Sequence, residues 1–178
     1  MARNFDALGA YQGASLGTRD VGPCKLLAMF SLRPRMFADC EVMVSWVADA
    51  EDLYLFTGPR LSWPLTPDKL YTMEEPGLSP WMLVEEGADS PRGHFDLAID
   101  GKVARIGRVL IDPAHRGRGL AHVLVGLAIN QAKLLGASAM ELNVVADNEP
   151  AIHTYTCAGF TGVPHPERPN ITVMRLPL

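Results

Sequence analysis

The stretch RVLIDPAHRGRGLA, residues 108–121, decides the fold of this 178-residue chain, because an apolar strand runs directly into a glycine turn that opens a long helix. The first amides of a helix have no partner within the helix, and the helix dipole is positive at that end. Gly117 and Gly119 lack a Cβ, so an anion can approach the main chain closely. The stretch therefore predicts a phosphate site, to which Arg116 and Arg118 add charge.

Two other phosphate-binding motifs fit this stretch poorly. A P-loop requires Lys followed by Ser or Thr after the glycines, and no such pair follows here. The dinucleotide motif G-x-G-x-x-G matches at Gly117 and Gly119, but His122 stands at the third glycine position. Only one strand-helix-strand unit is visible, so dinucleotide binding is the weaker alternative.

Two blocks of sequence carry a resemblance to a known family. Residues 116–121, RGRGLA, match the pattern R/Q-x-x-G-x-G/A. Residues 148–160 follow the spacing N-x-x-A-x-x-x-Y-x-x-x-G-F, with Asn148 at the first position and Tyr155 at the eighth. With both blocks the chain resembles the GCN5-related N-acetyltransferases (GNAT), most clearly from residue 93 to residue 160 and weakly before residue 80.

The resemblance implies an α/β fold with a mixed, mostly antiparallel central sheet and helices on both faces. The strands before and after the helix that follows the glycine turn would splay apart to admit CoA. We expect one such domain over residues 25–178, preceded by a leader, residues 1–24, that shows no clear period. The co-substrate would be acetyl-CoA.

The resemblance also implies which residues bind the cofactor and which act in catalysis. In this family the diphosphate lies on the glycine turn and the pantetheine runs beside the preceding strand. The expected cofactor contacts are Val109, Leu110, Ile111, Arg116, Gly117, Arg118, Gly119, Leu120, Ala121, His122 and Asn148. Tyr155 would protonate the departing thiolate, since a phenol with a pKa near ~10 is protonated at neutral pH. Taken alone, Tyr155 also fits a core aromatic, and Asn148 also fits a helix cap.

The residue that takes the proton from the amine is left open by the sequence. Many members of the family use a glutamate on the strand before the glycine turn, and residues 103–111 carry only two arginines as charged groups. His94 and Asp96 share one face of the neighbouring strand by its two-residue period. They and the pair Glu85 and Glu86 are candidates, although for each of them a solvated strand side chain is the simpler interpretation.

Length and composition limit the kinds of protein that this chain can be. A length of 178 residues with 48% hydrophobic residues suits one domain with one sizeable core. No apolar run approaches the ~18 residues that span a bilayer, and the first residues do not resemble a signal peptide, so we expect a cytoplasmic protein without membrane contact. Three widely spaced cysteines suit neither disulfides nor a zinc site, and no metal is expected.

The formal charge of −4 argues against nucleic-acid binding, but the charge is unevenly distributed. Residues 38–86 contain ten acids and two bases, whereas the rest of the chain contains ten acids and fourteen bases. The acids either lie on solvated helix faces or attract a cationic acceptor. A small cationic amine is thus the expected acceptor; alternatives are a protein N-terminus or lysine, or a non-catalytic acyl-CoA-binding regulator. A homodimer is one assembly open to the chain.

Hydrophobic periods, caps and turn residues predict the secondary structure. The expected strands are 25–32, closed by Arg33 and Pro34, then 81–84, 94–99, 103–111, 140–146 and 171–176. The expected helices are 36–47, 49–56, one starting at 66–68, then 119–135 and 148–158.

Overall fold

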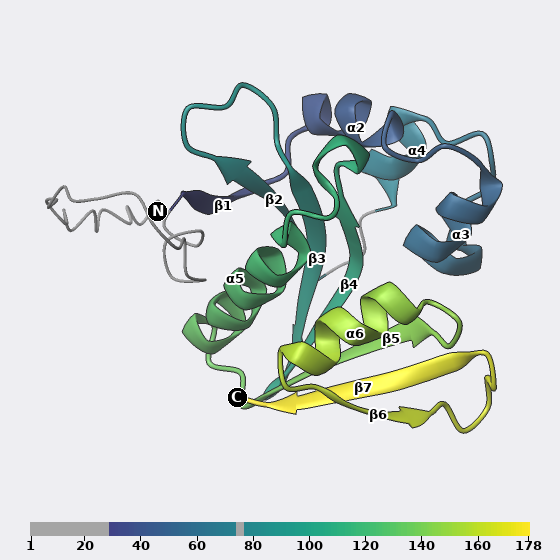
Figure 1. The fold of residues 1–178 in the computed structure, drawn as a ribbon, viewed down its shortest axis with the longest axis vertical. Helices are drawn as coiled ribbons and strands as arrows, with labels where there is room; N and C mark the ends of the chain where they lie inside the picture. Colours follow the sequence, from purple (N-terminus) through teal and green to yellow (C-terminus); the bar gives the residue numbers. More distant parts are fainter. Residues whose placement is uncertain (1–28, 74–76) are drawn as a thin grey trace, which may run out of the picture.

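A seven-stranded sheet forms the centre of the protein. The computed structural model describes residues 29–73 and 77–178, so the expected leader and the start of the first expected strand lie outside the described residues. The strands follow the order β1-β2-β3-β4-β5-β7-β6. Their bounds are β1 Phe30–Pro34, β2 Leu78–Glu85, β3 Gly93–Asp100, β4 Val103–Ile111, β5 Ala139–Val145, β6 Thr161–Pro164 and β7 Ile171–Pro177 (Figure 1).

The sheet is mixed and mostly antiparallel, as expected. Within the described chain, β4 and β5 form the one parallel pair, and every other neighbouring pair is antiparallel. The doubly wound parallel sheet that typical dinucleotide-binding domains require is therefore not the architecture of this chain.

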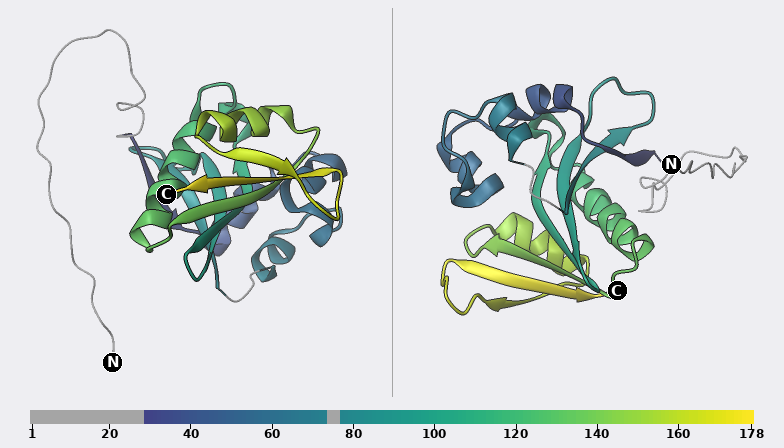
Figure 2. Two further views of the ribbon diagram at one scale, coloured as in Figure 1. Left: turned by 90° about the horizontal axis from the view of Figure 1, so that it is seen from below. Right: turned by 180° about the vertical axis from the view of Figure 1, so that it is seen from behind.

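Helices cover both faces of the sheet (Figures 1 and 2). One face carries α5 and α6, and the other carries α2, α3 and α4. Their bounds are α2 Phe37–Val44, α3 Ala50–Thr57, α4 Pro67–Thr72, α5 Leu120–Leu134 and α6 Glu149–Cys157. Among the described residues, no helix is both long and apolar enough to cross a membrane.

The helix ends follow from local residue choices that the sequence predicts. The Thr66 side chain accepts a hydrogen bond from the Lys69 amide, with Pro67 at the first helical position of α4. The Asp49 carboxylate accepts hydrogen bonds from two amides of the first turn of α3, both at 2.9 Å. Helix α5 stops at Gly136, whose φ of 84° is one that glycine adopts readily.

Each face of the sheet has its own core. Under α5, Phe95 and Leu97 of β3 pack among buried side chains that include Leu124 and Val125 of the helix. Under α2 to α4, Met43 and Leu53 belong to a second buried cluster. Burial of apolar side chains on both faces stabilises the sheet and holds the helices in place on it.

A partly buried ion pair joins the first strand to the second core. The Arg33 guanidinium donates two hydrogen bonds of 2.6 Å to the Asp39 carboxylate, which also accepts one from the Met36 amide at 2.7 Å. Burial alone would raise the pKa of Asp39, but these hydrogen bonds more than compensate and lower it. Asp39 is therefore ionised at neutral pH and holds the start of α2 against β1.

Strands β4 and β5 separate soon after they begin to pair. Their register covers Val103–Arg105 against Ala139–Glu141, and β4 then continues to Ile111 without a described strand on that side. The expected splay of the two strands is confirmed. It leaves one main-chain edge of β4 available to a ligand.

Two strand predictions need correction. The first strand ends at the expected proline, but Arg33 and Pro34 belong to it rather than follow it, because both pair with β2; β1 is an edge strand, where a proline without an N–H group is tolerated. Strand β6 was not predicted, since all four of its residues are exposed and show no alternation. Only its pairing with β7 makes it a strand.

Candidate functional site

The glycine turn is a rigid connection between β4 and α5. The Asp112 carboxylate accepts a hydrogen bond from the Ala114 amide at 2.9 Å and lies 2.8 Å from Nδ1 of His115, within the short 3-10 turn Pro113–His115. The Arg116 Nε donates to the Ile111 carbonyl at 3.3 Å. These contacts fix the turn to the end of β4.

The main chain of the turn is free to bind a ligand. Gly117 and Gly119 have φ angles of 74° and 77°, and α5 has no side-chain cap at Gly119. Within the described part of the chain, no group accepts a hydrogen bond from the amides of residues 117–121. A Cβ at either glycine would meet nothing within 4 Å, so the space beside the turn is open. Free amides at a helix N-terminus are an arrangement suited to phosphate.

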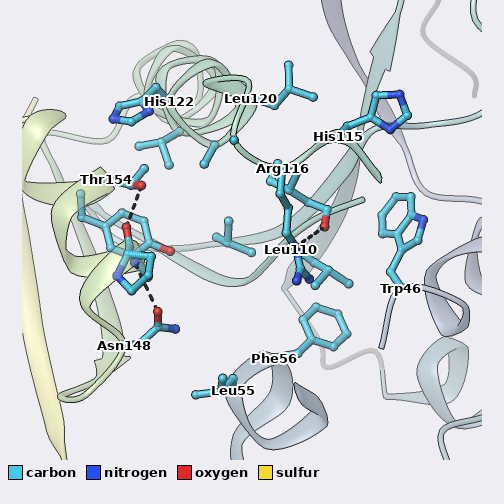
Figure 3. Close-up of a pocket in the computed structure, with 18 of the residues that line it drawn as sticks. Trp46, Leu55, Phe56, Leu110, His115, Arg116, Leu120, His122, Asn148 and Thr154 are labelled. Carbon is cyan, nitrogen blue, oxygen red and sulfur yellow. Dashed lines mark hydrogen bonds between the residues drawn. The ribbon is translucent and has the colours of Figure 1, made fainter. Parts of the chain in front are cut away.

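A cavity of about 600 Å³ lies beside these amides, between α3, α5, α6 and the end of β4. In Figure 3, Asn148, which precedes α6, and Thr154 of α6 lie across this cavity from Trp46. Every expected cofactor residue except Arg118 lines the cavity: Val109, Leu110, Ile111, Arg116, Gly117, Gly119, Leu120, Ala121, His122 and Asn148. Arg118 is exposed and does not line the cavity.

Tyr155 also lines this cavity. Its residue is 7% exposed, and its ring packs edge-on against Phe160 at 5.8 Å between centroids. No described group forms a hydrogen bond with its hydroxyl. Burial raises the pKa of Tyr155, so the phenol is neutral at physiological pH. The ring is thus a core aromatic, while the hydroxyl has no competing partner.

Asn148 caps the helix that carries Tyr155, as its residue type predicts. Its Oδ1 accepts a hydrogen bond from the Ala151 amide at 3.3 Å. The same residue lines the cavity, so the structural and the ligand-facing interpretations are compatible.

A second cavity of about 930 Å³ lies along the sheet, over β3, β4 and β5. The two cavities share the lining residues Leu55, Phe56, Val109, Asn148, Ala151 and Tyr155. They therefore meet where β4 and β5 separate, with Tyr155 and Val109 at the junction. Two molecules that enter from the two sides would come together at that point.

The four candidate bases lie in different places. Glu85 forms an ion pair with Arg92 at 2.9 Å, Glu86 is exposed, and neither lines either cavity. His94 and Asp96 are buried, with exposed fractions of 0% and 1%. Their interpretation as solvated strand side chains is wrong, because α3 covers His94 and the Arg108 guanidinium covers Asp96.

Sequence reasoning missed the wall that α3 and the segment between α2 and α3 give to the first cavity. Trp46 comes from that segment, and Asp52, Leu55 and Phe56 come from α3. The helical spacing of residues 49–56 showed which of these side chains share a helix face, but nothing local indicated what that face would meet.

The acidic half of the chain is mostly not part of the site. Of the acids between residues 38 and 86 that the structure describes, Asp52 alone lines either cavity. Asp39 is buried against Arg33 and Asp49 caps α3, so these acids serve the fold. The charge imbalance is therefore explained largely by caps, ion pairs and solvated helix faces.

Comparisons with known proteins agree with this architecture. A domain from Methanocaldococcus jannaschii superimposes with a TM-score of 0.70 at 19% identity, over 84% of this chain and 98% of that one. The spermidine N-acetyltransferase of Vibrio cholerae, in complex with CoA and spermine, superimposes with a TM-score of 0.69 at 17% identity, over 84% and 96%. Both show the same fold.

Sequence relationships are more local. A mycothiol acetyltransferase of Mycobacteroides abscessus is 37% identical over 67 residues, which are 38% of this chain and 22% of that protein, so the match spans about a fifth of the relative's length. The profile of the acetyltransferase (GNAT) family matches residues 43–160, well over half of the chain. That stretch contains the glycine turn, the junction of the two cavities and Tyr155. The chain belongs to the acetyltransferase (GNAT) family.

Proposed function

We propose that this protein transfers the acetyl group of acetyl-CoA to the primary amine of a small acceptor, by direct attack while both substrates are bound. The observation that carries this proposal is the continuity of the first cavity, which runs from the unbonded amides of the glycine turn to the hydroxyl of Tyr155. The structural relative that binds CoA and spermine supports a small amine as acceptor.

The fit of CoA rests on the main chain. The amides of residues 117–121 would bind the diphosphate, aided by the dipole of α5 and the nearby charge of Arg116. The free edge of β4 at Val109–Ile111 would pair with the amide groups of the pantetheine. Asn148 would lie against the same arm, while Arg118, outside the cavity, would contribute only longer-range charge.

The acetyl transfer would take place at the junction of the two cavities, where the amine, the thioester and Tyr155 would meet. The amine nitrogen attacks the thioester carbonyl carbon, a C–N bond forms, the C–S bond breaks, and sulfur leaves as a thiolate. Tyr155 gives its hydroxyl proton to that sulfur as the thiolate forms and recovers a proton from water; burial, which raises its pKa, keeps the phenol protonated before the reaction. A main-chain N–H of β4 polarises the carbonyl.

The amine acceptor would bind on the side of the first cavity that α3 forms. Asp52, beside Trp46 and Phe56, would attract the ammonium form of the acceptor, since carboxylates and aromatic faces both favour cations. We assign the amine's proton to water in the open second cavity, because β4 carries no carboxylate.

Three expectations stay predictions from the sequence: the cytoplasmic location, the division into leader and domain, and a homodimer.

An amine panel tests the activity. Purified protein is mixed with acetyl-CoA and a polyamine, an aminoglycoside, an amino acid or peptides with a free N-terminus or lysine, and thiol release is followed. We expect saturable release with at least one small primary amine and none with its N,N-dimethylated analogue, which cannot form a stable amide. Release with peptides alone would identify a protein acceptor. Saturable acetyl-CoA binding without release would indicate a regulator.

Tyr155→Phe should lower kcat about tenfold or more and leave acetyl-CoA affinity unchanged, because only the proton donor is lost while the ring still packs on Phe160. Tyr71→Phe, at an exposed position of α4 outside both cavities, is the matched control and should keep full activity. An unchanged kcat in Tyr155→Phe would remove this tyrosine from the mechanism.

Gly119→Val should abolish CoA binding, because a side chain there occupies the space beside the free amides. Without ligand, a Cβ at Gly119 meets nothing within 4 Å, so the fold loses only about 1–2 kcal/mol to left-handed backbone strain. Gly136→Val is the control at the other end of α5, where φ is 84° and the space is equally open. Calorimetric titration should show binding for Gly136→Val alone; binding by both variants would contradict the phosphate assignment.

A further inference from the structure

A buried polar cluster lies beside the junction of the two cavities, and the proposed mechanism does not use it. We name it the β3–β4 cluster, and it consists of His94, Asp96 and Arg108. His94 and Asp96 are 0% and 1% exposed, and the Arg108 side chain is 10% exposed. The Arg108 Nε donates to Asp96 Oδ2, and His94 Nε2 lies 3.4 Å from Asp96 Oδ1.

The cluster coincides with a bulge in β4. His94 pairs with Leu110 and Asp96 pairs with Gly107, so three steps along β4 oppose two steps along β3. The extra residue falls at Arg108 and Val109. Bulges re-aim the local main chain and leave one residue without a pairing partner.

Arg108 holds an unfavourable backbone conformation at this bulge. Its φ is 48°, and in the described ranges no other residue except glycines has a positive φ. A residue with a Cβ stays in this region only when its surroundings hold it there. The contact that holds Arg108 is the ion pair with Asp96 on the adjacent strand.

The electrostatics of the cluster support that role. Burial raises the pKa of Asp96, but His94 and Arg108 lower it by more, so the net pKa is below the usual range and the carboxylate is charged at neutral pH. A charged pair in so little solvent is a strong and directional restraint.

The cluster has little contact with other protein groups. Among the described residues, His94 Nδ1, His94 Nε2, Asp96 Oδ1 and Arg108 Nη1 form no well-aligned hydrogen bond with a protein group. His94 and Asp96 therefore face each other at 3.4 Å as a close contact rather than as a well-formed hydrogen bond. Asp96 and Arg108 both line the second cavity, but Asp96 is 1% exposed and its Oδ2 accepts from Arg108, so the carboxylate contacts Arg108 rather than open solvent.

The location connects the cluster to the reaction. Val109, next to Arg108, lines both cavities, and so does Phe56, whose ring packs edge-on against His94 at 6.1 Å. The bulge therefore sets the direction of the main chain where the acyl group would meet the amine.

We propose that Asp96 is a positioning residue, supported by His94, that anchors Arg108 and thereby holds the β4 bulge in the conformation that presents its main chain to the acyl carbonyl. This inference rests on the proposed acetyltransferase function. In this proposal a carboxylate of β3 holds the main chain of β4 in place through its contact with Arg108.

A double-mutant cycle tests the proposal by turnover. Asp96→Asn should lower kcat about tenfold and change the KM for acetyl-CoA less than twofold. Arg108→Ala should be similarly impaired, whereas Arg108→Gly should retain most activity, because glycine adopts a φ of 48° without an anchor. In the Arg108→Gly background, Asp96→Asn should then have less than a twofold effect. An equal effect of Asp96→Asn in both backgrounds would overturn the proposal.

Asp39→Asn is the matched control, since Asp39 is likewise buried and paired with an arginine but lines neither cavity. It should lower the thermal unfolding temperature and leave kcat unchanged, which separates positioning from general destabilisation.

A crystal structure of Asp96→Asn gives a readout that does not depend on activity. Arg108 should return to negative φ, with a changed register between β3 and β4. An unchanged bulge would refute the inference even if the wild-type enzyme is active. Conversely, a relaxed bulge in a protein that acetylates no amine would keep the anchoring role and reject the proposed function.

Discussion

The short pairing of β4 with β5 is the constraint on which the rest of the site depends. After three residue pairs the strands separate, and β4 continues with one edge unpaired until it reaches the glycine turn. Main-chain groups that lose a strand partner must find another, in water or in a ligand. The free edge of β4 and the free amides of α5 form one continuous polar surface, and both cavities open onto the gap that the separation creates.

Both strands that border this gap belong to one buried core. Ile106 of β4 and Leu142 of β5 pack in the same cluster under α5 and α6, while α2 to α4 cover the other face of the sheet. Tyr155 extends from α6 into the junction, and Phe56 reaches it from α3. Residues from the two halves of the chain thus meet at one point, although the sequence signals for them lie about a hundred residues apart. In the proposed binding mode the ligand-binding groups are mostly backbone, and the side chains determine where that backbone points.

What the sequence could predict was local. The glycine turn, the Thr66 and Asn148 caps and the Gly136 stop depend on residues within one turn of each other, and all are present as expected. The position of Tyr155 beside the turn came from family resemblance rather than from periodicity. The burial of His94 and Asp96 was not predictable, because it depends on α3 and on Arg108, which come from other parts of the chain. Strand β6 and the bulge at Arg108 carry no local signal either, since each is defined by pairing with a neighbouring strand.

The central claim is that the amides at the start of α5 hold the diphosphate of CoA. The most direct measurement is a titration of ¹⁵N-labelled protein that follows the amide resonances of residues 117–121, once with CoA and once with pantetheine, which lacks the diphosphate. Large shifts of these five amides with CoA and small ones with pantetheine are the predicted result. Saturable CoA binding that leaves these resonances in place would contradict the account.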